Sequence, residues 1–376
     1  MGESVRLFIL YCLLQINLFY IITSCDSNPI IDYNVNPSQT IVSTIYGSFN
    51  GIKLYDACTF TLIDSISTPL DAPTFVENTN DGHKLFSVLN DDNANNFLIS
   101  LSTNPLSIVQ IVPCIGWRVT KNFSDDILFV YGGFYNTLQL FNLESLSVLR
   151  EQQISKIGLM ISSPTENKMY GLRADEGYSS IFIYNIDSLS IIEEIQFSSI
   201  AEIATDISVS NDDRFVFFTT FLGSSSFLAK FYAFDTQSRS IVSEIYCPPF
   251  ASVGVSPDGK SVYITDPAGY LYELPSSGKL LRYDVETRSM NVFIDWVPYN
   301  LTSAFEGRLP TKKVIVSPDN RYLYITTSAA RTETGKSMDI LKVNVRNKKV
   351  INFLSIPHDY RGYKTEIINN IKLINN

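Results

Sequence analysis

The sequence predicts an all-β fold made of seven copies of one four-stranded antiparallel unit, and two recurring motifs predict it. The first is a polar turn that leads into an apolar strand, as at 210–219, 256–265 and 317–326. The second is a strand that ends in Asp, Asn or Ser, in most copies with Thr or Ser three positions later. Asp and Asn hydrogen-bond their own backbone two residues on, so the second motif is typical of a hairpin turn.

The second motif occurs seven times, at intervals of 40 to 60 residues. Its copies are Tyr55-Asp56, Leu101-Ser102, Phe141-Asn142, Tyr184-Asn185, Phe234-Asp235, Tyr283-Asp284 and Val343-Asn344. A unit of this length cannot bury both faces of its sheet alone, so neighbouring units must stack. A closed ring of units leaves only short sheet edges. The sequence therefore predicts a seven-bladed β-propeller, with a β-sandwich and an open solenoid as the alternatives.

Each blade is expected to contain four strands, A to D in chain order. In the fifth blade, strand A is 206–210, and the polar turn leads to strand B at 214–219. A variable loop leads to strand C at 228–235, and the second motif leads to strand D at 239–246. No stretch of 12 or more residues has an amphipathic helical period, which argues against the α/β classes.

The first blade shows three strands near the start of the repeats, at 41–46, 52–56 and 62–67. Its innermost strand has two candidates. The apolar C-terminal run 366–374 would join the two ends of the ring, and the alternative is a local strand at 30–35.

Two strands, Tyr263-Ile264-Thr265 and Tyr324-Ile325-Thr326, resemble the signature strand of the YVTN family of β-propeller repeats. The resemblance covers most of the chain from about Thr40 and is clearest in the last three blades. It implies an exported or surface propeller. Related propellers include surface-layer proteins, amine dehydrogenase heavy chains and lactonase-like enzymes, so the resemblance implies an architecture and not one activity. The Trp-Asp pair of WD40 blades is absent.

Composition agrees with a sheet protein that has a large core. Hydrophobic residues make up 45% of the chain, including 21 Tyr and 24 Phe, and charged residues only 18%. The net charge is −9. Because non-specific affinity for nucleic acid comes from neutralising phosphates, this charge argues against a nucleic-acid partner.

The N-terminus is expected to be separate from the fold, with a signal peptide or membrane anchor at 1–24 and a linker at 25–39. The propeller would then be a single domain at 40–376. The apolar segment ends in Ile22-Thr23-Ser24-Cys25, which resembles a bacterial lipobox and would make Cys25 the lipid-carrying first residue. A cleaved secretory signal and an uncleaved anchor are the alternatives. We expect an exported protein, either secreted or held in the cell envelope as a lipoprotein.

The residues of common catalytic and metal sites are scarce. The chain has two histidines, His83 and His358, and it contains no G-x-S-x-G elbow, P-loop or EF-hand string. We therefore expect no catalytic residue, no metal and no cofactor. Cys58, Cys114 and Cys247 lie in separate blades, so they are expected to be buried thiols.

Strand parity places the B–C and D–A connections on one face of the ring, and binding residues concentrate on such variable loops. The candidate ligand-binding residues are Trp117, Arg118, Arg173, Tyr178, Asp266, Trp296, Arg308 and Arg331. Arg118, Arg173 and Arg331 come from different blades and could form a local anion-attracting funnel. The alternative is that each arginine pairs with a nearby carboxylate, such as Asp175, Glu176 or Asp266.

Two function classes follow. The first is a monomeric, non-catalytic binding protein that takes a protein, a glycan or a small anionic ligand on this face. It would contact a membrane only through its N-terminal lipid or anchor. The second is a propeller enzyme of the lactonase or amine-dehydrogenase type. A carboxylate cluster converging on the central channel around a metal would favour the enzyme.

Overall fold

The computed structural model describes most of the chain from Gln39 to Asn375. The residues outside this description are 1–38, 48–49, 71–72, 74, 92–94, 133–135, 155–156, 176, 223–227, 268–278, 296–310, 328–338, 356–365 and 376. The sequence predictions for Cys25, Trp296, Arg308 and Arg331 lie outside the described residues.

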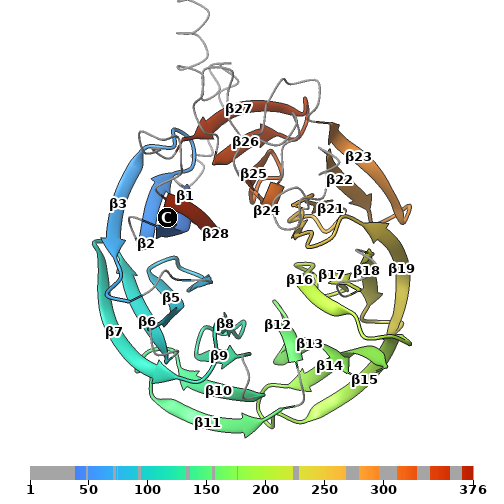
Figure 1. Ribbon diagram of the computed structural model, residues 1–376, viewed down its shortest axis with the longest axis horizontal. Coiled ribbons are helices and arrows are strands. Elements are labelled where there is room, and N and C mark those ends of the chain that lie inside the picture. The colour runs from blue at the N-terminus through green and yellow to red at the C-terminus, as the bar shows by residue number, and fades with distance from the viewer. Residues whose placement is uncertain are drawn as a thin grey trace, which may run out of the picture.

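Seven four-stranded antiparallel sheets form a ring, which confirms the predicted seven-bladed β-propeller (Figure 1). Blade 1 consists of β28 (Glu366–Asn375), β1 (Gln39–Gly47), β2 (Gly51–Asp56) and β3 (Leu62–Ser67); blade 2 of β4 (Val76–Asn78), β5 (Lys84–Asn90), β6 (Asn96–Thr103) and β7 (Leu106–Cys114); blade 3 of β8 (Arg118–Lys121), β9 (Ile127–Tyr131), β10 (Thr137–Asn142) and β11 (Val148–Gln153); and blade 4 of β12 (Ile157–Ser162), β13 (Lys168–Asp175), β14 (Tyr178–Asn185) and β15 (Ile191–Ser198). Blade 5 consists of β16 (Ile203–Val209), β17 (Phe215–Phe221), β18 (Ala229–Asp235) and β19 (Ser240–Cys247); blade 6 of β20 (Val253–Val255), β21 (Ser261–Ile264), β22 (Lys279–Asp284) and β23 (Ser289–Asp295); and blade 7 of β24 (Thr311–Val316), β25 (Tyr322–Thr327), β26 (Ile340–Asn344) and β27 (Lys349–Leu354).

The first strand of each blade in this order lies next to the middle of the ring, and the fourth lies at the rim (Figure 1). The inner strands contact one another around the ring, for example β12 with β16 and β20 with β24. They enclose the opening that we call the central channel.

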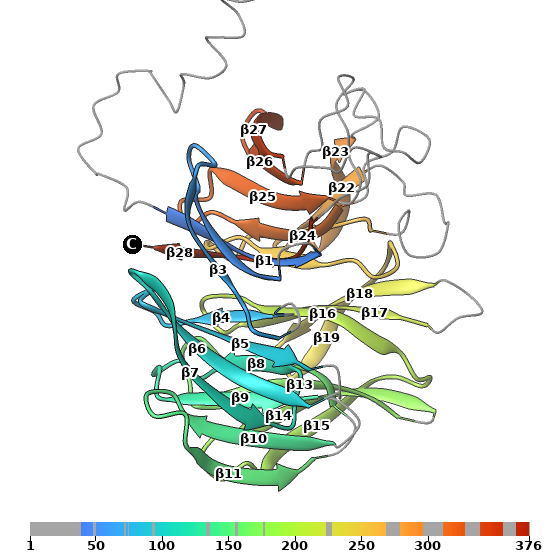
Figure 2. The same ribbon diagram turned by 60° about the vertical axis from the view of Figure 1, so that its left-hand side comes forward.

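The C-terminal strand closes the ring. β28 pairs antiparallel with β1, from Gln39 opposite Asn375 to Gly47 opposite Glu366, and the two strands lie side by side in Figure 2. This pairing confirms the prediction that the run 366–374 supplies the inner strand of blade 1. The alternative segment, 30–35, lies outside the described residues.

The A–B turns are held by a side-chain network that the polar motif encodes. In blade 6, the Ser256 hydroxyl donates to Asp258 at 2.6 Å and accepts from the Ser261 amide at 2.9 Å. Burial alone would raise the pKa of Asp258. The hydrogen bonds that its carboxylate accepts from Ser256 and Lys260 outweigh this effect, so its pKa lies below the usual value. Gly259 follows with a φ of 70°, which explains why Gly occurs here.

The C–D turns are held by the strand-end Asp or Asn, as the second motif predicts. Asp235 Oδ1 accepts from the amides of Gln237 at 2.9 Å and Ser238 at 3.1 Å. Asp284 Oδ1 accepts from both the amide and the hydroxyl of Thr287 at 2.9 Å. These bonds favour the ionised carboxylate and lower the pKa of Asp284.

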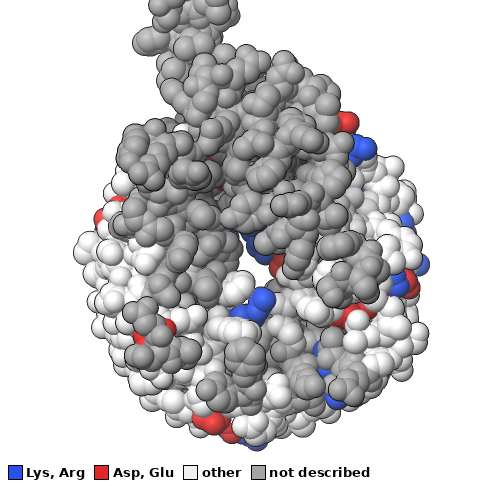
Figure 3. Space-filling model, viewed as in Figure 1, with Lys and Arg blue, Asp and Glu red and all other residues white. Residues whose placement is uncertain are grey.

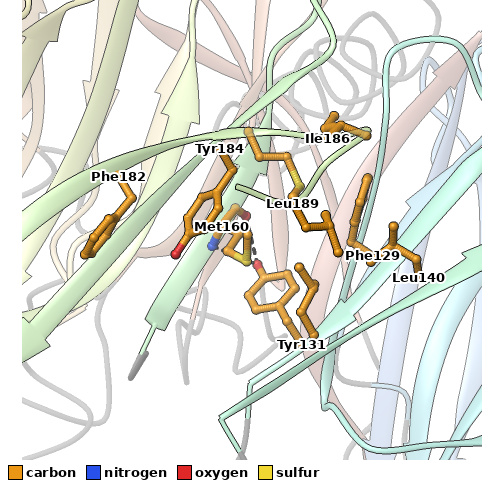
Figure 4. Packing of buried hydrophobic residues seen from close by; sticks show 10 residues of the cluster. Phe129, Tyr131, Leu140, Met160, Phe182, Tyr184, Ile186 and Leu189 are labelled. Atoms are coloured by element: carbon orange, nitrogen blue, oxygen red, sulfur yellow. Dashed lines mark hydrogen bonds between the residues drawn. The ribbon is translucent and has the colours of Figure 1, made fainter. Parts of the chain in front are cut away.

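The hydrophobic core lies between neighbouring blades. Between blades 3 and 4, Phe129 and Tyr131 pack with Met160, Phe182 and Tyr184 (Figure 4). The Tyr131 hydroxyl donates to the Met160 carbonyl at 2.8 Å and accepts from the Met160 amide at 3.1 Å. Each such side chain contributes about 1.5–3 kcal/mol by burial, and the hydroxyl is satisfied within the core.

A β-bulge recurs near the start of the rim strand. In blade 1, Tyr55 pairs with Leu62 and Leu54 pairs with Asp64, so Ile63 is an extra residue on β3. The equivalent extra residues of blades 2, 3, 4 and 7 are Val109, Leu149, Ile192 and Ile351. All five side chains are exposed aliphatic groups.

Candidate functional site

The two ends of the channel open on unlike faces. The A–B and C–D turns form one face, and the B–C and D–A connections form the other, which we call the loop face. The longest connections between successive strands, β21–β22, β23–β24, β25–β26 and β27–β28, all belong to the loop face. Binding residues are most often found on such connections, so the loop face is the candidate functional face.

Trp117 lies on the loop face in the D–A connection that enters blade 3. Its amide donates to the Tyr131 carbonyl at 3.2 Å, and 41% of the residue is exposed. The indole packs on the backbone at the end of β9, because a Cβ built on Gly132 would lie 2.5 Å from Trp117 Nε1. Gly132 also has a φ of 90°, so two independent constraints require glycine there.

Arg118 begins β8 directly after this tryptophan. Its guanidinium carbon lies 4.4 Å from the centroid of the Phe75 ring, which belongs to the neighbouring blade 2. The guanidinium makes no hydrogen bond or ion pair with any residue that the structure describes. Within the described part of the chain, no carboxylate therefore neutralises Arg118.

A polar cluster joins the inner strands of blades 5, 6 and 7. Lys313 Nζ on β24 lies 3.1 and 2.9 Å from the two carboxylate oxygens of Asp206 on β16. Asp206 also accepts from the Ser252 hydroxyl and, at 3.0 Å, from the Val253 amide. The ion pair thus reaches past the inner strand of blade 6 and is part of the channel wall.

A second ion pair joins the closing strand to blade 2, between Lys372 on β28 and Glu77 on β4. Burial raises the pKa of Tyr131; Arg118 opposes that rise, whereas Glu77 and Asp206 add to it. The charges of blades 2, 3 and 5 therefore all reach Tyr131, in the core between blades 3 and 4. Figure 3 shows basic and acidic side chains at the narrow opening in the middle of the ring.

Arg173 and Tyr178 are brought together in blade 4 by the hairpin between β13 and β14. The guanidinium carbon of Arg173 lies 5.7 Å from the centroid of Tyr178 and 5.6 Å from that of Phe182. Burial raises the pKa of nearby Tyr184 to about 12, although the charge of Arg173 opposes the rise. The contacts of Arg173 lie within blade 4, whereas the contact of Arg118 with Phe75 joins blades 3 and 2.

Asp266 is buried, with 1% of the residue exposed. Its amide donates to the Thr311 hydroxyl at 2.9 Å, and its carbonyl accepts from the Thr311 amide at 3.0 Å. Asp266 therefore joins blade 6 to blade 7 beneath the loop face and is not displayed there.

Sequence reasoning named Arg118 but missed Asp206, Ser252 and Lys313. It looked for function in loops, whereas these three residues lie in or directly before the inner strands. The repeat register could have found them. Counting back four residues from the first residue of each A–B turn gives a set that we call the channel tier. Its members are Phe75, Arg118, Leu159, Asp206, Ser252 and Lys313.

A buried acid lies in the D–A connection between blades 4 and 5. The side chain of Glu202 has no exposed surface and accepts from Ser198 at 2.8 Å, from Thr220, and from the Tyr232 hydroxyl at 3.0 Å. Lys230 Nζ lies 3.4 Å away. These partners satisfy the carboxylate, so its role is to hold blade 5 together.

Two of the predicted thiols are confirmed. Cys114 and Cys247 are free and half-buried, and burial raises the pKa of Cys114 to about 12.

Among the described residues, no group of three or more His, Cys, Asp and Glu side chains could hold a metal ion. No helix in the same part of the chain has the length and apolar character needed to cross a membrane.

No protein-family model and no curated protein sequence matches the chain. Solved structures do match it. A Bacteroides uniformis protein named as a candidate 6-phosphogluconolactonase is 15% identical, with a TM-score of 0.62, over 90% of this chain and all of the other. Hydrazine synthase of Kuenenia stuttgartiensis is 13% identical, with a TM-score of 0.56, over 74% of this chain and 78% of the other. The β-propeller domain of Cps50 (Swd1) from Myceliophteria thermophila is 10% identical, with a TM-score of 0.57, over 79% and 89%. Similarity at this level shows the fold alone, and the chain is a seven-bladed β-propeller.

Proposed function

We propose that this protein is an exported, non-catalytic binding protein that takes its ligand on the loop face. The observation that carries the proposal is the difference between the two faces. One face is built from short turns locked by repeated hydrogen bonds, as at Ser256 and Asp235. The other holds the long connections and Trp117, of which 41% is exposed.

A glycan or peptide array tests this proposal. Trp117→Ala removes an exposed ring at the channel mouth, so we expect affinity for the bound array member to fall about tenfold or more. Phe123→Ala is the matched control, because Phe123 is an aromatic residue of the β8–β9 turn, on the opposite face, with 40% exposure. It should bind like the unchanged protein. Equal effects of both substitutions would contradict a loop-face site, and steady turnover of lactones would favour the enzyme alternative.

Export is supported by the apolar N-terminal segment, which is typical of a secretory signal. We propose further that Cys25 carries lipid and holds the protein to a membrane. Stable anchoring needs more than one acyl chain, a need that a lipidated N-terminal cysteine of bacterial lipoproteins meets.

Cys25→Ser is expected to move the protein from the membrane to the soluble fraction with its fold intact. Fractionation and detergent partition measure this change. Cys58→Ser keeps Cys25 and should leave the protein in the membrane fraction. Retention of the Cys25→Ser protein in the membrane would indicate an uncleaved anchor instead.

A further inference from the structure

We propose that Arg118, stacked on Phe75, anchors a carboxylate or phosphate group of the ligand at the loop-face mouth of the channel. The inference rests on the proposed function, since it names the chemical group that the same face recognises. It concerns one side chain whose hydrogen-bonding capacity is unused within the described structure.

The basic side chains around the channel differ in how they are neutralised. Lys313 pairs with Asp206, Lys372 with Glu77 and Lys121 with Asp125. Arg118 pairs with no described carboxylate. Glu77 and Asp206, whose charges act with that of Arg118 on Tyr131, are already paired with Lys372 and Lys313. Within the described residues, Arg118 is therefore a local point of attraction for an anion.

The geometry suits a planar or tetrahedral anion. A guanidinium presents five N–H donors in a fixed fork, and such a fork binds carboxylate or phosphate with two parallel hydrogen bonds. The Phe75 ring at 4.4 Å holds one face of the guanidinium, which limits its rotation and leaves its edge for a ligand. This reduces the ordering cost of binding.

The neighbours of Arg118 supply contacts for the rest of a ligand. Trp117, the preceding residue, exposes an aromatic surface on the loop face. Elsewhere in the channel tier, Asp206, Ser252 and Lys313 form a neutral hydrogen-bonded group. Among the residues that the structure describes, the tier thus has one cation without a carboxylate partner and, elsewhere, a compensated polar group. This arrangement favours a ligand with a single anionic end.

The test uses three matched probes: benzoate, phenyl phosphate and the neutral benzyl alcohol. Titration calorimetry of the full-length protein should detect benzoate or phenyl phosphate and should not detect benzyl alcohol at the same concentration. Whichever anion binds more tightly identifies the group as carboxylate or phosphate. Raising the salt concentration should weaken the binding, because the contact is ionic.

Arg118→Met is expected to abolish anion binding, and Arg118→Lys to weaken it about tenfold, because lysine keeps the charge and loses the fork. Lys260→Met, which changes a basic residue of an A–B turn on the opposite face, should bind like the unchanged protein. Equal melting temperatures establish that the variants are folded, and Arg118→Lys serves if Arg118→Met does not fold.

Anion binding that survives in Arg118→Met, or an unchanged protein that prefers neither anion over benzyl alcohol, would overturn the inference. The result is separable from the proposed function. Array binding that depends on Trp117 and survives Arg118→Met would refute the anchor and keep the loop-face site. Anion binding that depends on Arg118, with no array member that depends on Trp117, would keep the anchor and refute the proposed binding function.

Discussion

A chain that ends at residue 365 is expected to lose cooperative folding. The deletion removes β28, which supplies the whole inner edge of blade 1 and contacts β24 and β4 on either side. Ile374 is 2% exposed in a core cluster with Val42 and Leu85, and its loss would open that cluster to water. The ring is closed by this strand, so the expected loss is a large part of the total stability, which is about 5–15 kcal/mol for a folded domain.

Calorimetry and urea unfolding measure the effect. Ile374→Ala is a milder change that keeps the strand, and it should lower the free energy of unfolding by about 2–5 kcal/mol. Lys372→Met keeps both the strand and the apolar contact but leaves Glu77 without its ion pair, so it isolates the charge contribution. A truncated protein with an unchanged melting temperature would show that the ring does not depend on the C-terminal strand.

The second large effect is expected for Glu202→Ala, which should destabilise the protein by about 3–5 kcal/mol. The carboxylate is fully buried, and its removal leaves the Tyr232 and Thr220 hydroxyls without their acceptor. Burial lowers the pKa of Lys230, but contacts with Glu244 and Glu202 raise it more. Lys230 is therefore charged in the folded protein and would lose one of its two carboxylates.

Glu244→Gln is the matched control. Glu244 contacts the same Lys230 Nζ at 2.7 Å, but 49% of its side chain is exposed. An exposed ion pair contributes about 0–1 kcal/mol, so this substitution should change the urea midpoint little. Similar losses for Glu202→Ala and Glu244→Gln would contradict the assignment of Glu202 as the buried centre of this network.

The architecture could be predicted because the turn chemistry repeats. The hydrogen bond from Ser256 to Asp258 has an equivalent in blades 5 and 7, where the polar motif has the same form. The strand-end Asp284 closes its hairpin through its bonds to Thr287. Such contacts are encoded within a few residues of chain. The choice of strand for the inner position of blade 1 stayed open, because it joins residues from opposite ends of the sequence.

The candidate site was predicted less completely for the same reason. Strand parity predicts that Trp117 and Arg118 lie at the loop-face end of blade 3, since parity depends only on strand order. It could not show that Asp266 is buried, because that follows from its contact with Thr311 in the next blade. Nor could it show the pair of Asp206 and Lys313, whose partners are more than a hundred residues apart.

The bulge that recurs at the rim has a consequence for aggregation. Each blade ends in an edge strand whose outward N–H and C=O groups could template pairing with another molecule. The exposed side chains of Ile63, Leu149 and Ile192 would stabilise such pairing by burying apolar surface. The extra residue interrupts the regular spacing of edge hydrogen-bonding groups and increases the local twist, so an incoming straight strand cannot stay in register. The rim can therefore carry aliphatic side chains without becoming a seed for fibres.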